Sequence, residues 1–286
     1  ERTSDGVNFL PYVRDDQGKI IELARLQDAA PLSGLINATA LWQLVSVVVA
    51  QKHLADIGEK LKNIQRVVDD IHAFQHDERR ASIIGTAEYL KQVERSVRSG
   101  ELSNAVRTRL EDNEMTLLRV QGHLLDDIKR QIARVPLVKG SDFIGTEKHF
   151  QALTAHESQL SEHLKDWTLC TMARTMNWQV LAFFPGERKL KEDRLKSLRA
   201  AFDEFLVGES IVANSNKVWE QKLQATKSRF NKNATLELRR EKLRTTRLAT
   251  AAYVEQTLHP IFMSLDHGRS LLLEAERPLT LAIRMD

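Results

Sequence analysis

The stretch "VVVAQKHLADIGEKLKNIQRVVDDI" occupies residues 47–71 and repeats its apolar residues at alternating intervals of three and four. This heptad pattern predicts a helix with one apolar seam that packs against other helices. Charged residues between them, such as Glu59, Lys60 and Asp69, fall outside the seam. The seam positions are Val47, Ala50, Leu54, Ile57, Leu61, Ile64, Val68 and Ile71.

The helical pattern extends well beyond this stretch, because proline, which breaks helix interiors, is rare in the chain. There are 6 prolines, and none lies between Pro31 and Pro136. The pattern drifts after residue 71 toward Gly100, and we expect a kink or turn near Gly85. Helix-forming residues dominate the proline-free runs, so long helices are predicted.

Further helices are predicted over residues 101–135 and 146–183 from their apolar spacing. The predicted apolar side of the first consists of Leu110, Leu117, Leu118, Leu124, Leu125, Ile128 and Ile132, and the predicted seam of the second consists of Phe150, Leu153, Leu160, Leu164 and Trp167. The last long region, 187–265, is expected to hold two helices that meet near residues 207–210. Few aromatic residues and many charges are typical of thin helical proteins. The sequence therefore predicts a mainly α fold: an elongated bundle of long antiparallel helices with coiled-coil-like packing.

The two ends of the chain show a different periodicity. Two apolar runs surround "DDQG", which predicts a β-hairpin over residues 8–14 and 19–25. The last residues, "RPLTLAIRMD", alternate with period two and predict a strand that joins this hairpin in a small β element near the two termini. The predicted division is an N-terminal hairpin segment (1–33), a long-helix bundle (34–277) and a C-terminal strand (278–286).

Composition and cysteine content restrict the function only weakly. Lys plus Arg is 42 and Asp plus Glu is 39, a net charge of +3 that gives no argument for nucleic acid by itself. The one cysteine, Cys170, excludes an internal disulfide and favours a cytoplasmic location, with a secreted or membrane-associated one as the alternative. The chain begins at Glu1, and an N-terminal segment already removed would not be visible.

The sequence holds no motif for cofactor-dependent chemistry. It has no Walker sequence and no Gly-rich dinucleotide fingerprint, and Cys170 lies in an apolar helical pattern that favours a packing role. His149, His156 and His163 are spaced by seven, without the companion ligands of a zinc site. Three stacked imidazoles would repel one another when protonated, so a pH-sensitive flank is the alternative. We expect no catalytic residue, metal or cofactor, and no enzyme.

A basic region between residues 227 and 247 has three interpretations. It is a solvated helix packed opposite acidic neighbours, a contact for anionic lipid, or a contact for nucleic acid phosphates. Its charges are distributed around the helix and no nucleic-acid-binding motif accompanies them, so nucleic acid ranks last. The candidate basic patch comprises Arg229, Lys232, Arg239, Arg240, Lys242, Arg244 and Arg247.

Residues 29–51 contain no charge in a chain that is 28% charged. The apolar part, "LWQLVSVVVA", is shorter than a bilayer-spanning helix and apolar on nearly every side. It is either a buried helix end or a partner or membrane segment over residues 34–50. The candidate contact residues are Leu41, Trp42, Leu44, Val45, Val47, Val48 and Val49.

These observations predict a non-catalytic helical interaction or assembly protein, with a protein partner or self-association. The alternative is a membrane-active protein, because an apolar segment joined to a long helix beside a β-hairpin resembles α-helical pore-forming toxins in layout. An anionic membrane would then be the partner.

Overall fold

A computed structural model describes residues 8–9, 12–14, 20–23, 26–27, 62, 78–98, 103–136, 147–184, 186–225 and 233–274. The chain divides into two compact units, Glu1–Leu41 and Trp42–Asp286. We describe each unit by itself.

The first unit contains four short strands in two antiparallel pairs. β1 (Asn8–Phe9) pairs with β4 (Leu26–Gln27), and β2 (Tyr12–Arg14) pairs with β3 (Ile20–Leu23). The register of β2 and β3 shifts between Val13 and Arg14. The predicted C-terminal strand, 278–286, lies outside the described residues, so the small β element that would unite both termini stays a prediction.

The described part of the second unit is helical, which confirms a mainly α fold. The predicted helices over 101–135 and 146–183 are present as α3 and α4, whereas the region after residue 187 forms three helices instead of two. The helices in the described part are α2 (Glu78–Arg98), α3 (Asn104–Ala133), α4 (Glu147–Ala182), α5 (Arg188–Leu206), α6 (Ile211–Ala225) and α7 (Asn233–Glu274).

Local sequence accounts for several helix ends. Ser103 caps α3, since its side chain accepts a hydrogen bond of 3.2 Å from the Val106 N–H. Between α4 and α5, Gly186 and Glu187 have φ of 84° and 56°, and between α5 and α6, Gly208 has φ of 63°. Gly186 and Gly208 adopt such angles without steric cost, whereas Glu187 takes a left-handed conformation that non-glycine residues seldom adopt. The turns at these positions end the helices on either side.

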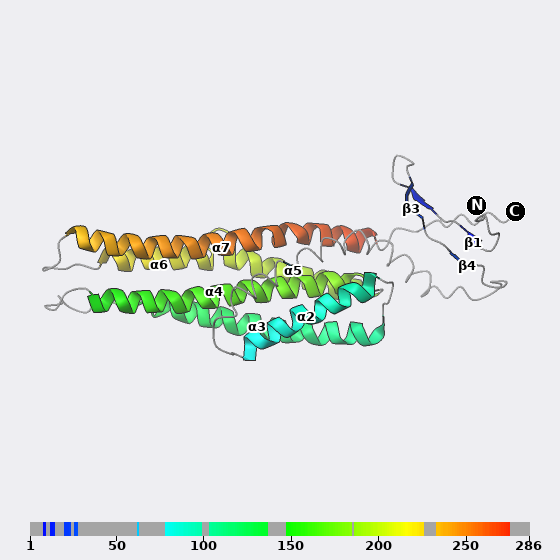
Figure 1. Cartoon of the computed structure of the whole chain (residues 1–286), viewed down its shortest axis with the longest axis horizontal. Coiled ribbons are helices and arrows are strands. Elements are labelled where there is room, and N and C mark those ends of the chain that lie inside the picture. The colour runs from blue at the N-terminus through cyan, green and yellow to red at the C-terminus, as the bar shows by residue number, and fades with distance from the viewer. Residues whose placement is uncertain are drawn as a thin grey trace. The chain divides into compact units, whose positions relative to one another are not determined.

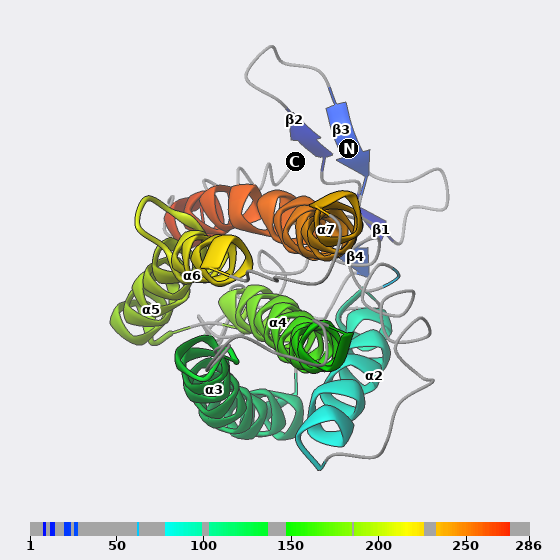
Figure 2. The ribbon, with the colours of Figure 1, turned by 90° about the vertical axis from the view of Figure 1, so that its left-hand side faces the viewer.

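Helix α4 contacts more of the other helices than any other element described. It packs against α2, α3, α5 and α7, and the end-on view of Figure 2 shows it between α3 and α2 on one side and α7 on the other. Asn177 of α4 donates a hydrogen bond to Leu110 of α3, and Arg174 of α4 donates one to Glu114 of α3. Residue numbers therefore increase along α3 as they decrease along the adjacent α4. Helices α3 and α4 are therefore antiparallel.

Helix α7 departs from the antiparallel expectation. Its Arg247 contacts Glu157 and its Ser264 contacts Gln179, so α7 and α4 run in the same direction. The reason is that α5 and α6 act as two halves of one return leg, broken at residues 207–210. Figure 1 shows these two helices following one another beside α7.

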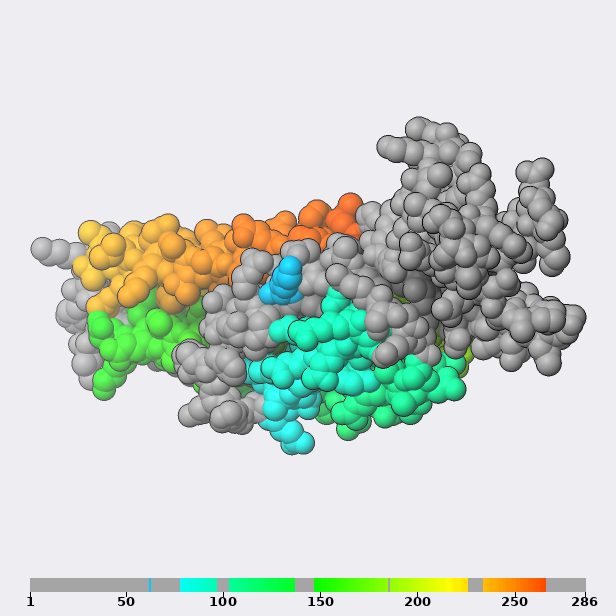
Figure 3. All heavy atoms as spheres, turned by 45° about the vertical axis from the view of Figure 1, so that its right-hand side comes forward, coloured from blue at the N-terminus to red at the C-terminus, as the bar shows by residue number. Residues whose placement is uncertain are grey.

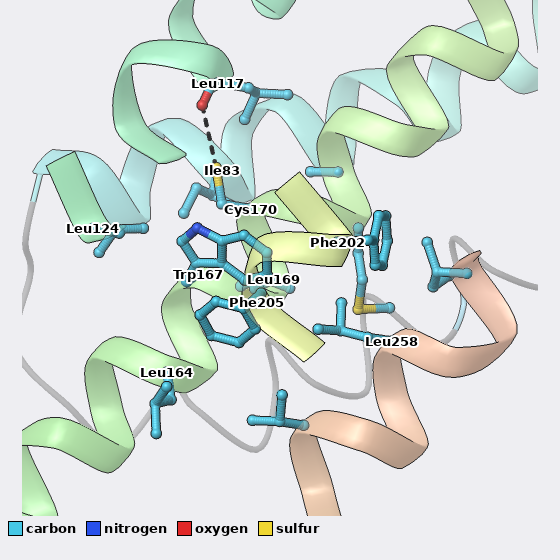
Figure 4. Close-up of a cluster of buried hydrophobic side chains, with 14 of the residues drawn as sticks. Ile83, Leu117, Leu124, Leu164, Trp167, Leu169, Cys170, Phe202, Phe205 and Leu258 are labelled. Carbon is cyan, nitrogen blue, oxygen red and sulfur yellow. Dashed lines mark hydrogen bonds between the residues drawn. The ribbon is translucent and has the colours of Figure 1, made fainter. Parts of the chain in front are cut away.

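The core is centred on the second half of α4. Trp167 stacks on Phe205 of α5 with ring centroids 3.7 Å apart, and the Cys170 thiol donates a hydrogen bond of 3.4 Å to the Leu117 carbonyl (Figure 4). The predicted seam of α4 is buried throughout. It consists of Phe150, Leu153, Leu160, Leu164 and Trp167.

Two other sequence predictions have different outcomes. Gly85 lies inside the continuous helix α2, so the chain makes no turn there. The seam of residues 47–71 lies outside the described residues, apart from Lys62, which is exposed as its place off the seam requires.

Candidate functional site

The predicted partner or membrane segment, residues 34–50, lies outside the described residues. All of its candidate contact residues, from Leu41 to Val49, therefore remain predictions. Among the helices that the structure describes, none combines the length and apolar character needed to cross a bilayer.

The four described arginines of the basic patch all form ion pairs with carboxylates. Arg229 and Lys232 lie outside the described residues, and Lys242 is exposed. Arg239 pairs with Glu147 of α4, and Figure 3 shows this end of α7 beside the first turns of α4. Arg244 pairs with Glu220 of α6 at 2.5 Å.

The remaining two arginines of the patch also have carboxylate partners. Arg240 pairs with Glu237 one turn earlier on α7 at 2.5 Å. Arg247 is buried and donates to both carboxylate oxygens of Glu157, at 3.3 and 3.1 Å. This pairing agrees with a helix packed opposite acidic neighbours, the first of the three interpretations of the patch.

Arg247 is the centre of a polar cluster buried between α4, α6 and α7. Besides Glu157, it binds the side chains of Ser215 and Asn216 on α6. Its guanidinium also lies 6.0 Å from the ring centroid of Trp219, which in turn is 5.8 Å from the imidazole of His156 on α4. We call these six residues the Arg247 cluster.

Burial sets the protonation of the ionisable groups in this cluster. It raises the pKa of the Glu157 carboxyl, an effect that the neighbouring Arg247 guanidinium partly offsets. It lowers the pKa of His156, and Arg247 lowers it further, while the main chain of Gln131 raises it. The imidazole is therefore neutral in a site that already holds one cation.

A second buried network links α3, α4 and α5. Arg174 is 1% exposed and donates to Glu114 at 2.9 Å, to Gln121 at 2.7 Å and to Ser197 at 3.1 Å. Gln121 in turn donates to Thr171 at 2.6 Å. The network connects three helices at one level, so it fixes their relative register.

This network could have been predicted from the sequence by a lone charge in an uncharged run, a feature that the periodicity argument does not consider. Arg174 is the only charged residue between Asp166 and Glu187, in a run that is otherwise apolar or uncharged polar. A lone charge in such a run must find a partner in the interior. Asp166, at the start of the run, receives two hydrogen bonds from Arg80 of α2, at 2.9 and 2.8 Å.

One side of α7 presents apolar residues to solvent. Leu238 is 73% exposed, Leu248 65% and Met263 50%. At 3.6 residues per turn these three positions fall within an arc of about 80°, over a length of about 38 Å. The exposed Ala249 and Ala252 lie on the same side, interspersed with the exposed polar residues Glu241, Thr245, Gln256 and His259. We call the five apolar residues the outer face of α7.

The nucleophile and metal ligands considered from the sequence take other roles. Cys170 is buried and burial raises the pKa of its thiol, which confirms a packing role. Of the three histidines spaced by seven, His156 is buried, and His149 and His163 are half-buried. Within the described ranges, no group of three or more His, Cys, Asp or Glu side chains is placed to hold a metal ion.

Known proteins supply no further guide to the site. A comparison with protein-family models, with curated proteins and with solved structures finds no match to this chain.

Proposed function

We propose that this chain is a non-catalytic helical interaction or assembly protein that docks a protein partner on the outer face of α7. The observation that carries the proposal is the exposure of Leu238, Leu248 and Met263 on one side of a long helix. These residues are spaced along one side of α7 with polar residues between them, and we infer from their shared side that they contact one partner.

The described ionisable groups support the non-catalytic part of the proposal. The buried carboxylates of Glu114, Glu157 and Asp166 are each bound by an arginine of another helix. The Cys170 thiol is protonated and sealed in the core, so it does not supply a thiolate nucleophile. These groups hold helices together instead of facing a substrate.

A second copy of the chain is the partner to which the proposal commits. The outer face has a large apolar residue near each end, Leu238 and Met263, and the small Ala249 and Ala252 between them. Two such faces paired in opposite directions would place Leu238 against Met263 at both ends, with Leu248 and the two alanines near the centre. A twofold contact requires this kind of self-complementary surface.

Sedimentation of the full chain over a wide concentration range tests the proposal. We expect the mass to rise with concentration, and Leu248→Lys to weaken the association tenfold or more, because burying one leucine contributes about 1.5–3 kcal/mol. Leu118→Lys, at an exposed leucine of α3, is the matched control and should leave the association unchanged. A mass that stays monomeric at every concentration, or equal effects of both variants, would reject the outer face as the contact.

The proposal includes the finer architecture predicted from the sequence. It takes the helices as an elongated bundle with coiled-coil-like packing, a small β element near both termini and a cytoplasmic location. The alternative, a membrane-active protein that inserts residues 34–50, rests on the uncharged stretch of the sequence. If it is correct, a fluorophore near Trp42 should become accessible to a quencher in the lipid phase when anionic liposomes are added.

A further inference from the structure

We propose that His156 is an acid-sensitive latch, and that protonation of its imidazole releases α6 from the surface formed by α4 and α7. This inference concerns the interior of the Arg247 cluster and does not depend on the outer face of α7.

The surroundings of His156 do not stabilise a positively charged imidazole. Its side chain is buried, at 9% exposure, and neither ring nitrogen has a hydrogen-bond partner among the described residues. The ring instead lies 5.8 Å from that of Trp219, with an interplanar angle of 57°. A neutral imidazole fits this apolar contact, whereas an imidazolium would lose its hydration and have only the main chain of Gln131 as an acceptor.

The cluster residues around the imidazole come from α4, α6 and α7, and the charged ones come from α4 and α7. The guanidinium of Arg247 on α7 lies 6.0 Å from the centroid of the Trp219 ring, which His156 also contacts. On α4 itself, both carboxylate oxygens of Glu157 already accept hydrogen bonds from Arg247. From α6 the cluster receives only the uncharged Ser215, Asn216 and Trp219.

The main chain of Gln131 on α3 is the one neighbour that favours the protonated ring, and burial together with Arg247 outweighs it. Protonation would therefore place a second cation in a site whose single carboxylate is occupied. Separation of the surrounding helices relieves this, because water then reaches both cations.

Helix α6 is the element that should separate. It is the shortest described helix, with 15 residues, and it buries only four of them: Ile211, Ser215, Trp219 and Leu223. Two of those four, Ser215 and Trp219, belong to the Arg247 cluster. Outside the cluster, α6 is also joined to α7 by the partly exposed Arg244–Glu220 ion pair. Helices α4 and α7 are joined outside the cluster by the Ser161–Thr250 and Gln179–Ser264 hydrogen bonds.

The direction of the pH effect follows from linkage. The pKa of His156 is lower in the folded protein than its ordinary value of 6.5. The released state therefore binds more protons, and docking of α6 loses stability as the pH falls below 6.5. The loss continues until the pH passes the folded-state pKa, and for one proton the released fraction grows at most about tenfold per pH unit.

Hydrogen–deuterium exchange of the full chain, corrected for the pH dependence of chemical exchange, measures this release. We expect exchange in α6 to increase as the pH falls below about 6.5, while exchange in α3 stays constant. His156→Leu should abolish the increase, because leucine fills the site and cannot be protonated. His123→Gln, at an exposed histidine of α3, is the control and should retain it.

Three results would overturn the proposal. The first is an α6 that stays protected down to the pH at which the whole chain unfolds. The second is an acid transition that survives in His156→Leu, because Glu157 or another group would then be responsible. The third is an NMR titration of the unmodified protein, which needs no variant to fold, in which the pKa of His156 equals or exceeds its ordinary value of 6.5.

Discussion

Replacement of Arg174 by methionine tests whether the buried network between α3, α4 and α5 is as important to stability as its geometry suggests. The substitution keeps much of the side-chain volume but removes bonds to Glu114, Gln121 and Ser197. It also leaves the buried Glu114 carboxylate without a cation. Breaking a buried pair by removing one partner costs about 3–5 kcal/mol, so we expect a loss of that size in the free energy of unfolding.

The double variant Arg174→Met with Glu114→Met distinguishes this cause from a simple packing defect. It removes both charges, so the desolvated carboxylate no longer contributes. The remaining cost is the Gln121 amide oxygen, which loses its donor, and an unpartnered buried acceptor costs about 1–3 kcal/mol. The double variant should therefore be more stable than Arg174→Met alone, although it carries one more substitution.

Urea unfolding followed by far-ultraviolet circular dichroism measures these differences. The control is Arg188→Met, which removes an exposed pair with Glu192 on α5 and should change stability by no more than about 0.5 kcal/mol. A loss below about 1 kcal/mol for Arg174→Met would refute the reasoning. So would a double variant that is as unstable as the sum of its single substitutions.

Five further substitutions address other parts of the chain, with the unfolding free energy as the measurement for the first four and the thermal midpoint for the last. Gly85→Ala should stabilise α2 by about 0.5–1 kcal/mol, since the site is helical with open space around it, whereas Gly208→Ala should cost about 1–2 kcal/mol because of its left-handed φ. Ser103→Ala should cost about 1 kcal/mol by removing the cap of α3. Burial lowers the pKa of Lys191 to about 8, below its ordinary 10.5, so the unfolded chain holds the extra proton and stability should rise between these pH values. Lys191→Met should remove that rise, and a pH profile unchanged by the substitution would contradict it. Ile64→Asp should cost several kcal/mol if residues 47–71 form a buried seam, and an unchanged thermal midpoint would reject that seam.

Periodicity predicted the helices well where one side of the helix faces solvent. In α3, the predicted positions Leu110, Leu117 and Leu124 are buried, and the predicted ends lie within three residues of the observed ones. Leu118 was also placed on the apolar side but is exposed, because it lies 100° away from Leu117. The spacing rule identifies the side that packs, and single residues at its edge remain ambiguous.

Periodicity could not describe the second half of α4, which is surrounded by other helices. Every residue from Asp166 to Ala182 is buried, including the polar Thr168, Thr171 and Asn177. A helix enclosed on all sides has no solvent-facing side to set a repeat. The basic patch was ambiguous for a different reason: the partners Glu147, Glu157 and Glu220 lie far from the arginines in sequence and approach them only in the fold.

The central claim is that the outer face of α7 binds a second copy of the chain, and a nitroxide label at Ala252→Cys tests it most directly. Cys170 is buried with a protonated thiol and should remain unlabelled in the folded protein. At concentrations where the mass is dimeric, we predict strong dipolar coupling between labels at position 252 of two copies, near the proposed twofold axis. A label at Thr108→Cys, an exposed position on α3, should show far weaker coupling. Absence of coupling at position 252, or equal coupling at both positions, would contradict the proposed assembly.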